Sequence, residues 1–187
     1  RLALVGEGTT EWEVVEAALK SIVAPRSFVL TQLQPERTGP NLLGNGWGGV
    51  LKWCQQQAAR CRLAGVGLIE VDPTLSAFDG VVLHLDADVA TKAYGDLGLI
   101  YTPAFAAAQG WLPLPCPTHC PPESLPADDL HAVLLSWLHP AQPGERTVVC
   151  IPAMNTGAWQ AAAKLPAGHD LLTDLECNPA IEDRLPS

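Results

Sequence analysis

The chain has 187 residues, of which 48% are hydrophobic and 17% charged, a composition typical of one folded domain and not of a disordered segment. Its net charge of -9 and its eleven scattered Lys and Arg residues exclude an extended basic surface for nucleic acid. No apolar run is long enough for a membrane span or a signal peptide, and the six cysteines form no Cys-x-x-Cys pair, so we expect a cytoplasmic protein with reduced thiols.

The first predicted elements are a strand, a turn and a helix. Residues 2–5 form a short apolar strand pattern, and the glycine-rich turn 6–8 leads into a helix that ends before Pro25. Thr10 and Glu13 fit a capping box at the start of this helix. Helical spacing places four apolar side chains on its inward face: Trp12, Val15, Leu19 and Ile22.

The middle of the chain contains a strand, a loop, a helix and a second strand. Residues 27–33 are expected to be extended, and residues 38–49 form a loop rich in Gly, Asn and Pro. A helix over about 49–63 would turn four side chains inward: Val50, Cys54, Ala58 and Cys61. The segment 80–89 is nearly continuous in apolar residues before its aspartates, which indicates a strand covered on both faces.

The last part of the chain begins with an irregular excursion. Seven prolines fall between residues 103 and 126, which predicts little regular helix or strand there. A helix over 127–138, a strand over 146–152 and a final helix capped at Thr156 follow. The inward side chains of the first of these helices would be Leu130, Val133, Leu134 and Trp137. Alternating strands and helices predict one α/β domain over all 187 residues, with a mostly parallel four-stranded sheet and helices on both faces.

Acidic residues follow two of the predicted strands at their carboxyl ends. Glu7 follows the first strand, while Asp86 and Asp88 end the central strand and, being two residues apart, share one face. In open parallel sheets the ligand site lies beyond these strand ends, where the segment after Ile151 also arrives. Carboxylates placed so closely select a hard divalent cation, Mg²⁺ or Mn²⁺, and Glu11 in the following helix is positioned to complete the site.

These acids also have purely structural explanations. Glu11 and Glu13 suit the positive end of a helix dipole without any further role. Asp86 and Asp88 are acceptable turn residues at a strand end. The two glycines around Glu7 favour a functional role for it, because they let a ligand approach the backbone closely.

Other motifs are weaker. Cys116, His119 and Cys120 lie within five residues and lack the partner pair of a zinc site. The glycine segment 44–49 lacks both the lysine of a phosphate loop and its setting between a strand and a helix. His84 has the same strand parity as the aspartates, and we expect a satisfied core histidine deeper under a helix.

Three further side chains have two interpretations each. Trp47 and Trp111 fall in predicted loops, where they are either core residues or platforms on which a base stacks. Glu176 is a late acid that either lies on the surface or enters the acidic site.

Two segments carry the predicted carboxylates: LALVGEGTTE at the start and VVLHLDADVA in the middle. Together they resemble the Toprim domain of topoisomerases, primases and small nucleases. With the late segment IPAMNTGAW, they are most similar to stand-alone Toprim proteins allied to the overcoming-lysogenization-defect nucleases. The resemblance implies a Toprim-like fold in which Glu7 is the general acid or base, Asp86 and Asp88 hold Mg²⁺ or Mn²⁺, and Glu7 and Glu11 belong to the metal cluster.

The resemblance also implies where a substrate would bind. The backbone at Gly6 and Gly8 would approach it closely, and the late segment would contact it through Asn155 and Thr156. The related nucleases often carry a basic residue near the last strand, whereas this chain offers only Lys164, two turns further on. The missing cation would weaken or abolish cleavage.

We therefore expect a metal-dependent nuclease acting on DNA or RNA, with a role in defence against mobile elements implied by the resemblance alone. The rival is a Toprim-type metal- or nucleotide-binding subunit, which the acidic charge favours. A receiver-like domain with Asp86 as phosphate acceptor is weaker, because no acidic pair follows the first strand and no Lys directly follows the last. Nucleic acid would need the metal or a partner protein to offset the charge, no membrane contact is expected, and the proline-rich excursion suits a homodimer or partner contact.

Overall fold

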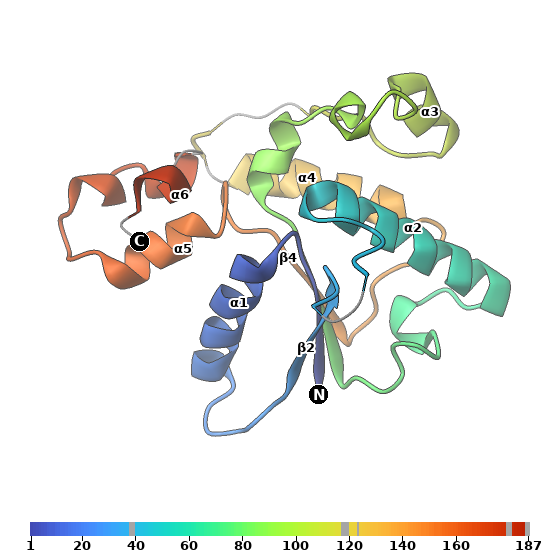
Figure 1. The fold of residues 1–187 in the computed structure, drawn as a ribbon, viewed down its shortest axis with the longest axis horizontal. Helices are drawn as coiled ribbons and strands as arrows, with labels where there is room; N and C mark the ends of the chain where they lie inside the picture. The colour runs from blue at the N-terminus through green and yellow to red at the C-terminus, as the bar shows by residue number, and fades with distance from the viewer. Residues whose placement is uncertain (38–39, 117–119, 123, 179–180, 186–187) are drawn as a thin grey trace.

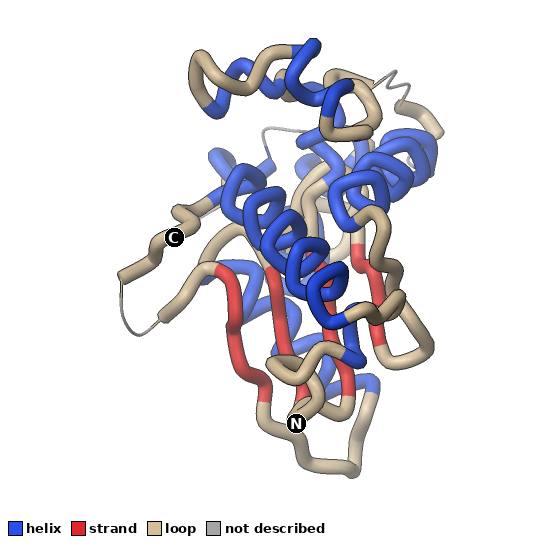
Figure 2. Tube along the Cα trace, turned by 90° about the vertical axis from the view of Figure 1, so that its right-hand side faces the viewer, coloured by secondary structure: helices blue, strands red, loops and turns tan. Residues whose placement is uncertain are grey.

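A four-stranded parallel sheet forms the centre of the structure, a computed structural model that describes residues 1–37, 40–116, 120–122, 124–178 and 181–185. The strand order is β2-β1-β3-β4, and Figure 2 shows the four strands in red. Their bounds are β1 (Leu2–Val5), β2 (Leu30–Gln34), β3 (Gly80–His84) and β4 (Thr147–Cys150). The predicted α/β class is confirmed, and the arrangement is compatible with a Rossmann-like or Toprim-type fold.

One face of the sheet is covered by α1 (Thr9–Ile22), which Figure 1 shows in blue. Val15 of this helix is buried against Leu4 and Val82 of the sheet. Ile22 was predicted to point inward but is 77% exposed, because the apolar cluster beneath the helix reaches only as far as Leu19.

The start of α1 differs from the predicted capping box. The helix begins at Thr9 and Gly8 is its N-cap, so Thr10 already lies inside the first turn. Thr10 and Glu13 are both exposed, and among the residues that the structure describes no side chain caps the helix. The Gly-Glu-Gly turn therefore sets the start of this helix.

The opposite face is covered by α2 (Gly46–Ala64) and α4 (Ser124–Leu138), which pack on each other as well as on the sheet (Figure 1). All eight side chains predicted to point inward from these helices are buried: Val50, Cys54, Ala58, Cys61, Leu130, Val133, Leu134 and Trp137. Helical periodicity thus identified this half of the core correctly.

The helix α2 begins three residues before the predicted start, at Gly46. The N–H of Gly46 donates to the carbonyl of Glu7 at 2.7 Å, which ties the helix start to the turn after β1. Gly49 permits this close packing, since a Cβ there would lie 2.4 Å from the carbonyl oxygen of Gly44. The helix therefore begins inside the glycine segment 44–49, and the lysine of a phosphate loop is missing from that segment.

Residues 103–126, which their prolines predict to be irregular, contain helix: α3 (Pro103–Ala108) lies within them and α4 already begins at Ser124. Two 3-10 helices, η2 (Ala87–Thr91) and η3 (Tyr94–Leu97), come before them. We call the whole segment between β3 and α4 the excursion. The hydroxyl of Thr102 caps α3, and Pro103 occupies the first turn, where its missing N–H has no cost.

Aromatic side chains anchor this excursion to α4. The hydroxyl of Tyr94 donates to the carbonyl of Leu112 at 2.7 Å and accepts from Trp137 Nε1 at 2.9 Å. Trp47 stacks on Trp137, and the ring centroids of Trp111 and Tyr94 lie 5.4 Å apart. Trp47 and Trp111 are each only 8% exposed, so both are core residues without a free face for a base.

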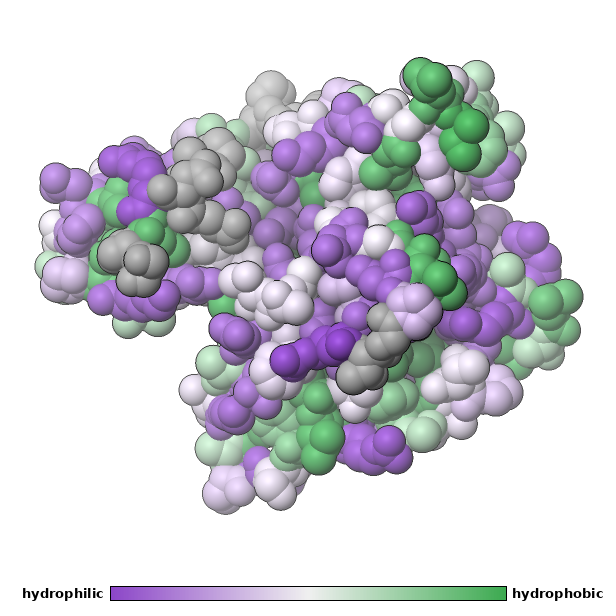
Figure 3. All heavy atoms as spheres, viewed as in Figure 1, coloured by the Kyte–Doolittle hydropathy of each residue, from purple (hydrophilic) through white to green (hydrophobic). Residues whose placement is uncertain are grey.

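The outer side of the excursion is apolar. Its segment 97–116 contains no charged residue. The large exposed side chains there are Leu99, Ile100, Phe105 and Leu112. Figure 3 shows hydrophobic side chains gathered at the corner that α3 occupies in Figure 1. The use of this excursion as a contact surface stays a prediction, and none of the helices in the described ranges is long and apolar enough to cross a membrane.

A buried glutamate fixes the turn before β4. Glu70 lies in η1 (Ile69–Val71) and is only 4% exposed. Its carboxylate accepts hydrogen bonds from Gly144 N at 2.9 Å, from Arg146 N at 3.2 Å and from Thr147 Oγ1 at 2.8 Å. Burial by itself would raise the pKa of Glu70, but these hydrogen bonds outweigh it and lower the pKa.

The chain continues beyond the helix that was predicted to be the last. After α5 (Gly157–Lys164) come η4 (Asp170–Leu172), η5 (Leu175–Cys177) and α6 (Ile181–Arg184). Figure 1 shows them as a lobe beside the sheet. The lobe has an apolar cluster of its own, with buried Ala158, Ala161, Leu171 and Ile181.

Two of the six cysteines form a disulfide bond, which corrects the expectation that all thiols are reduced. Cys120 and Cys177 are 57 residues apart in sequence, and the fold of the C-terminal lobe brings them together. The other four thiols are free: Cys54, Cys61, Cys116 and Cys150. Cys120 is thus unavailable as a thiolate to the weak zinc motif, whose His119 lies outside the described residues.

Candidate functional site

Glu7 and Asp86 meet at the carboxyl ends of β1 and β3. These strands are parallel neighbours, and each acid is the second residue after its strand. The N–H of Asp86 donates to Glu7 Oε1 at 2.9 Å. Two acids 79 residues apart in sequence are therefore in direct contact.

The segment after β4 closes over Asp86 and Asp88. Three backbone hydrogen bonds join the two segments: Leu85 N to Cys150 O at 3.1 Å, Ala87 N to Pro152 O at 3.2 Å, and Asp88 N to Met154 O at 2.7 Å. The pairing of β3 with β4 thus continues past the strand ends. It brings in Thr156, whose Oγ1 lies 3.3 Å from each carboxylate oxygen of Asp86.

Glu11 reaches back from the first turn of α1 over the backbone of Gly8. A Cβ at Gly8 would lie only 2.9 Å from Glu11 Oε2, so the glycine makes room for this carboxylate. Oε2 is buried and has no hydrogen-bond partner among the described residues. Its charge acts on both Glu7 and Asp86, as does that of Asp88. The four acids predicted for a metal site therefore share one edge of the sheet.

Burial makes the carboxyl groups of Glu7, Asp86 and Asp88 reluctant to ionise. Burial, with smaller contributions from the charges of Asp88 and Glu11, raises the pKa of Glu7 to about 8, although the N–H of Asp86 opposes the shift. Burial and repulsion from Glu7 raise the pKa of Asp86 to about 9. Burial also raises the pKa of Asp88, and the ammonium of Lys92 opposes it. At pH 7 the carboxyls of Glu7 and Asp86 hold protons unless a cation stabilises their charge.

Lys92 supplies the positive charge at this edge, and the sequence analysis missed it. Its Nζ lies 3.3 Å from Asp88 Oδ2, and the only signal was the four-residue spacing from Asp88. Lys164, the basic residue predicted for the site, lies exposed in the last turn of α5. There it lines a groove of about 440 Å³ between α1 and α5, together with Glu13 and Trp159.

The remaining predicted residues contribute backbone or lie elsewhere. The N–H of Gly6 donates to the carbonyl of Gln34 at 2.8 Å, and a Cβ at Gly6 would have 3.8 Å of clearance. This position therefore has room for a methyl group. Asn155 is only 5% exposed and precedes Thr156 in the segment that closes over the site. Glu176 is exposed in η5, in agreement with the surface interpretation.

His84 lies beneath the cluster and is fully buried. In the part of the chain that the structure describes, neither ring nitrogen has a hydrogen-bond partner, so the expectation of a satisfied histidine is wrong. Nε2 is 3.8 Å from Asp86 Oδ1, which is beyond hydrogen-bond reach. Burial lowers the pKa of His84 to about 4, so the ring is neutral at pH 7.

The cluster as it stands is not a finished metal centre. Among the described residues, no group of three or more His, Cys, Asp or Glu side chains is placed to hold a metal ion. Glu7 Oε1 accepts from the N–H of Asp86, and Asp88 Oδ2 faces the ammonium of Lys92. Binding of a cation would require some of these internal contacts to be exchanged.

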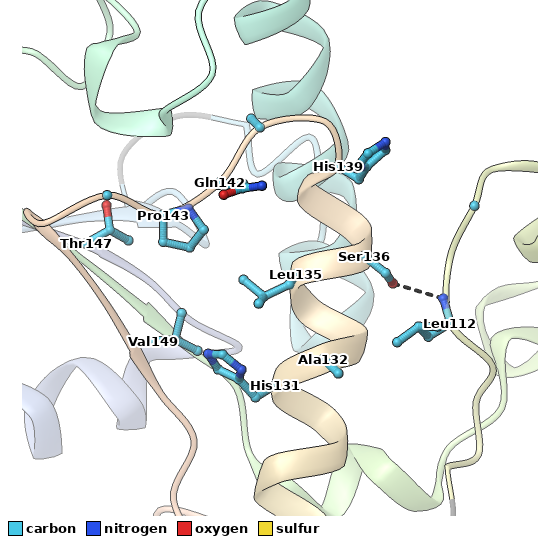
Figure 4. A pocket seen from close by; sticks show the side chains of 13 residues that line it. Leu112, His131, Ala132, Leu135, Ser136, His139, Gln142, Pro143, Thr147 and Val149 are labelled. Atoms are coloured by element: carbon cyan, nitrogen blue, oxygen red, sulfur yellow. Dashed lines mark hydrogen bonds between the residues drawn. The ribbon is translucent and has the colours of Figure 1, made fainter.

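A separate hollow of about 870 Å³ lies between α4 and β4 (Figure 4). His131 and Leu135 of the helix and Val149 of the strand project into it, and Ser136 Oγ accepts from Leu112 N at 3.0 Å at its rim. None of the four predicted acids lines this hollow, so it is not part of the carboxylate cluster.

The chain matches no family model, no curated protein and no solved structure. The α/β class therefore rests on the observed sheet and its helices. The Toprim resemblance remains a prediction.

Proposed function

We propose that this chain is a nuclease that hydrolyses phosphodiester bonds of DNA or RNA with the help of Mg²⁺ or Mn²⁺. The observation that carries the proposal is the cluster of Glu7, Glu11, Asp86 and Asp88 at the carboxyl ends of two adjacent parallel strands. Burial raises the pKa of three of these groups, and mutual repulsion adds to it for Glu7 and Asp86. A bound hard cation relieves both effects.

The donor atoms suit such a cation. All four side chains offer oxygen, which Mg²⁺ and Mn²⁺ prefer over nitrogen and sulfur. Glu11 Oε2 is a buried acceptor without a partner among the described residues, and a cation would supply one. Asp88 Oδ2 lies 3.3 Å from the ammonium of Lys92, a contact that a bound cation would replace. Asp86 and Asp88 would hold the ion, with Glu7 and Glu11 beside them.

The chain's own residues suggest how hydrolysis would be assisted. A bound Mg²⁺ or Mn²⁺ would supply Lewis-acid stabilisation of charge on a phosphate oxygen. Glu7 would hold or release a proton at its carboxyl group, whose pKa burial raises to about 8 when no cation is bound. The hydroxyl of Thr156 would orient Asp86, and Lys92 would offer a positive charge to a phosphate bound beside Asp88.

The acidic net charge bears on how a nucleic acid would reach this site. A charge of -9 repels phosphate, so DNA or RNA would need the metal or a basic partner protein. The second candidate function is a metal- or nucleotide-binding subunit that does not cleave. What favours it is that Lys92 is the only Lys or Arg in the described residues that pairs with the four acids.

The test compares cleavage and metal binding in the same preparations. Circular DNA, linear DNA and RNA are incubated with Mg²⁺ or Mn²⁺ and the wild type, Asp86→Asn, or Asp128→Asn as an exposed control on α4. Calorimetry follows metal binding in parallel. Metal-dependent cleavage that is lost only in Asp86→Asn supports the nuclease. Metal binding without cleavage of any substrate favours the subunit, and a wild type that binds no metal contradicts the site.

A further inference from the structure

His84 is a buried polar side chain whose ring nitrogens form no hydrogen bond with the described residues. It is 0% exposed and precedes Asp86 by two residues. Among the described residues, neither Nδ1 nor Nε2 finds a hydrogen-bond partner. An unpaired buried polar group destabilises the folded state, and such groups are rare in native folds. An imidazole in this position therefore needs an explanation beyond packing.

The ring is aimed at the carboxylate cluster. Its Nε2 lies 3.8 Å from Asp86 Oδ1. The Cβ atoms of His84 and Glu11 both lie 3.8 Å from the place that a Cβ on Gly6 would take, so the side chain of His84 starts close to the turn that carries Glu7. The carboxylate of Asp86 thus has two uncharged neighbours, the hydroxyl of Thr156 at 3.3 Å and the imidazole of His84.

We propose that His84 is a positioning residue for Asp86, whose carboxylate accepts a hydrogen bond from Nε2–H of His84 when a divalent cation binds. The proposal rests on the proposed metal-dependent function. At 3.8 Å this bond is not formed, and a small rotation of the carboxylate would close the distance. A carboxylate that accepts this hydrogen bond from His84 is fixed in one orientation. Its remaining lone pairs then point at the ion, which raises the affinity of the site for it.

The competing explanation is that His84 only fills space, and it predicts a different result. Replacing a space-filling, unpaired histidine by leucine would stabilise the fold and leave cation binding unchanged. A positioning role predicts the same stabilisation of the metal-free fold, where the ring is unpaired, but roughly 10–100-fold weaker binding of Mn²⁺ by His84→Leu. His84→Gln retains an N–H donor near the place of Nε2 and should recover most of the affinity.

The experiment measures the dissociation constant of Mn²⁺ for the full chain by electron paramagnetic resonance of the free ion. The matched control is Val82→Ala, which disturbs packing on the same face of β3, under α1, without removing a polar group. Loss of affinity in His84→Leu, recovery in His84→Gln and unchanged affinity in Val82→Ala support the proposal. Equal affinity in the wild type and His84→Leu overturns it and leaves the metal site standing. A wild type that binds no Mn²⁺ overturns the metal-dependent function, and this proposal with it.

A second measurement needs no variant. In ¹H–¹⁵N spectra of the wild-type imidazole, Mg²⁺ should produce a slowly exchanging, downfield Nε2–H signal with the same midpoint as Mg²⁺ binding. Ring signals of His84 that stay unchanged up to Mg²⁺ saturation overturn the proposal, even if His84→Leu fails to fold.

Discussion

Exchange of Asp86 for Asn tests whether the carboxyl cluster is destabilised in the way its burial implies. Asp86 is 7% exposed, and burial followed by repulsion from Glu7 raises its pKa from the ordinary 3.8 to about 9. A carboxyl group whose pKa is higher in the folded chain binds an extra proton there. The folded state therefore loses stability as the pH rises from the unfolded pKa towards the folded one.

The size of the effect follows from the number of such groups. Between pH 5 and pH 8, each carboxyl that is protonated when folded and ionised when unfolded costs about 1.4 kcal/mol per pH unit. Glu7 and Asp86 both belong to this class, and Asp86→Asn removes one of them. For one such group, the loss in the free energy of unfolding over three pH units is about 4 kcal/mol, and structural relaxation and water entry reduce it. Between pH 5 and pH 8 the stability of Asp86→Asn should therefore rise by about 2–4 kcal/mol relative to that of the wild type.

The assay is urea unfolding at pH 5, 6, 7 and 8 in the presence of EDTA, followed by tryptophan fluorescence. An amide at position 86 can still accept the hydroxyl hydrogen bond of Thr156, so packing is retained. Asp128→Asn removes an exposed carboxylate on α4 and should follow the wild type at every pH. If the free energies of unfolding of the wild type and Asp86→Asn run parallel across this range, burial does not destabilise the carboxyl and the reasoning is refuted.

Three further substitutions probe single contacts. Alanine at position 8 fits the extended backbone, so Gly8→Ala should change the free energy of unfolding by less than about 1 kcal/mol. Its methyl group displaces the carboxylate of Glu11, so calorimetry should show weaker Mn²⁺ binding. Unchanged Mn²⁺ binding would show that Glu11 is not part of the site. Gly49→Ala improves helix propensity yet drives a methyl group into the carbonyl of Gly44, and denaturant unfolding should show a loss of about 1–3 kcal/mol instead of a gain. Glu70→Gln should lose about 1–3 kcal/mol at pH 7, because an amide cannot accept all three hydrogen bonds. The carboxylate of Glu70 contributes its stability above its unfolded pKa of 4.5 and loses it as the pH falls through the lowered folded value, so variant and wild type should converge in acid.

Strands, helices and the convergence of the acids were predictable because each follows from a local pattern or a topological rule. Side chains such as Val50 and Leu130 repeat at helical spacing, and that spacing reports burial directly. The proximity of Glu7 and Asp86 was predictable because the carboxyl ends of adjacent parallel strands meet at one edge of the sheet.

The features that the sequence did not reveal depend on contacts between distant segments. The start of α2 is fixed by the hydrogen bond from Gly46 to Glu7, which overrides the poor helix propensity of glycine. The unpaired ring of His84 and the disulfide partner of Cys177 are likewise consequences of what lies opposite in space. Lys92 was passed over because a lysine four residues from an aspartate is usually a surface pair.

The contacts that build the carboxylate edge also have a consequence for folding order. Glu7 and Thr156 contact Asp86 across sequence separations of 79 and 70 residues. The first contact exists only after β3 has paired with β1, and the second only after β3 has paired with β4. Closing such long loops is slow compared with forming the local turns of α1 or α2. A refolding chain would therefore recover helical circular dichroism well before it recovers affinity for a cation. Uptake of Mn²⁺ would then report the pairing of β3 with β1, which brings Glu7 beside Asp86.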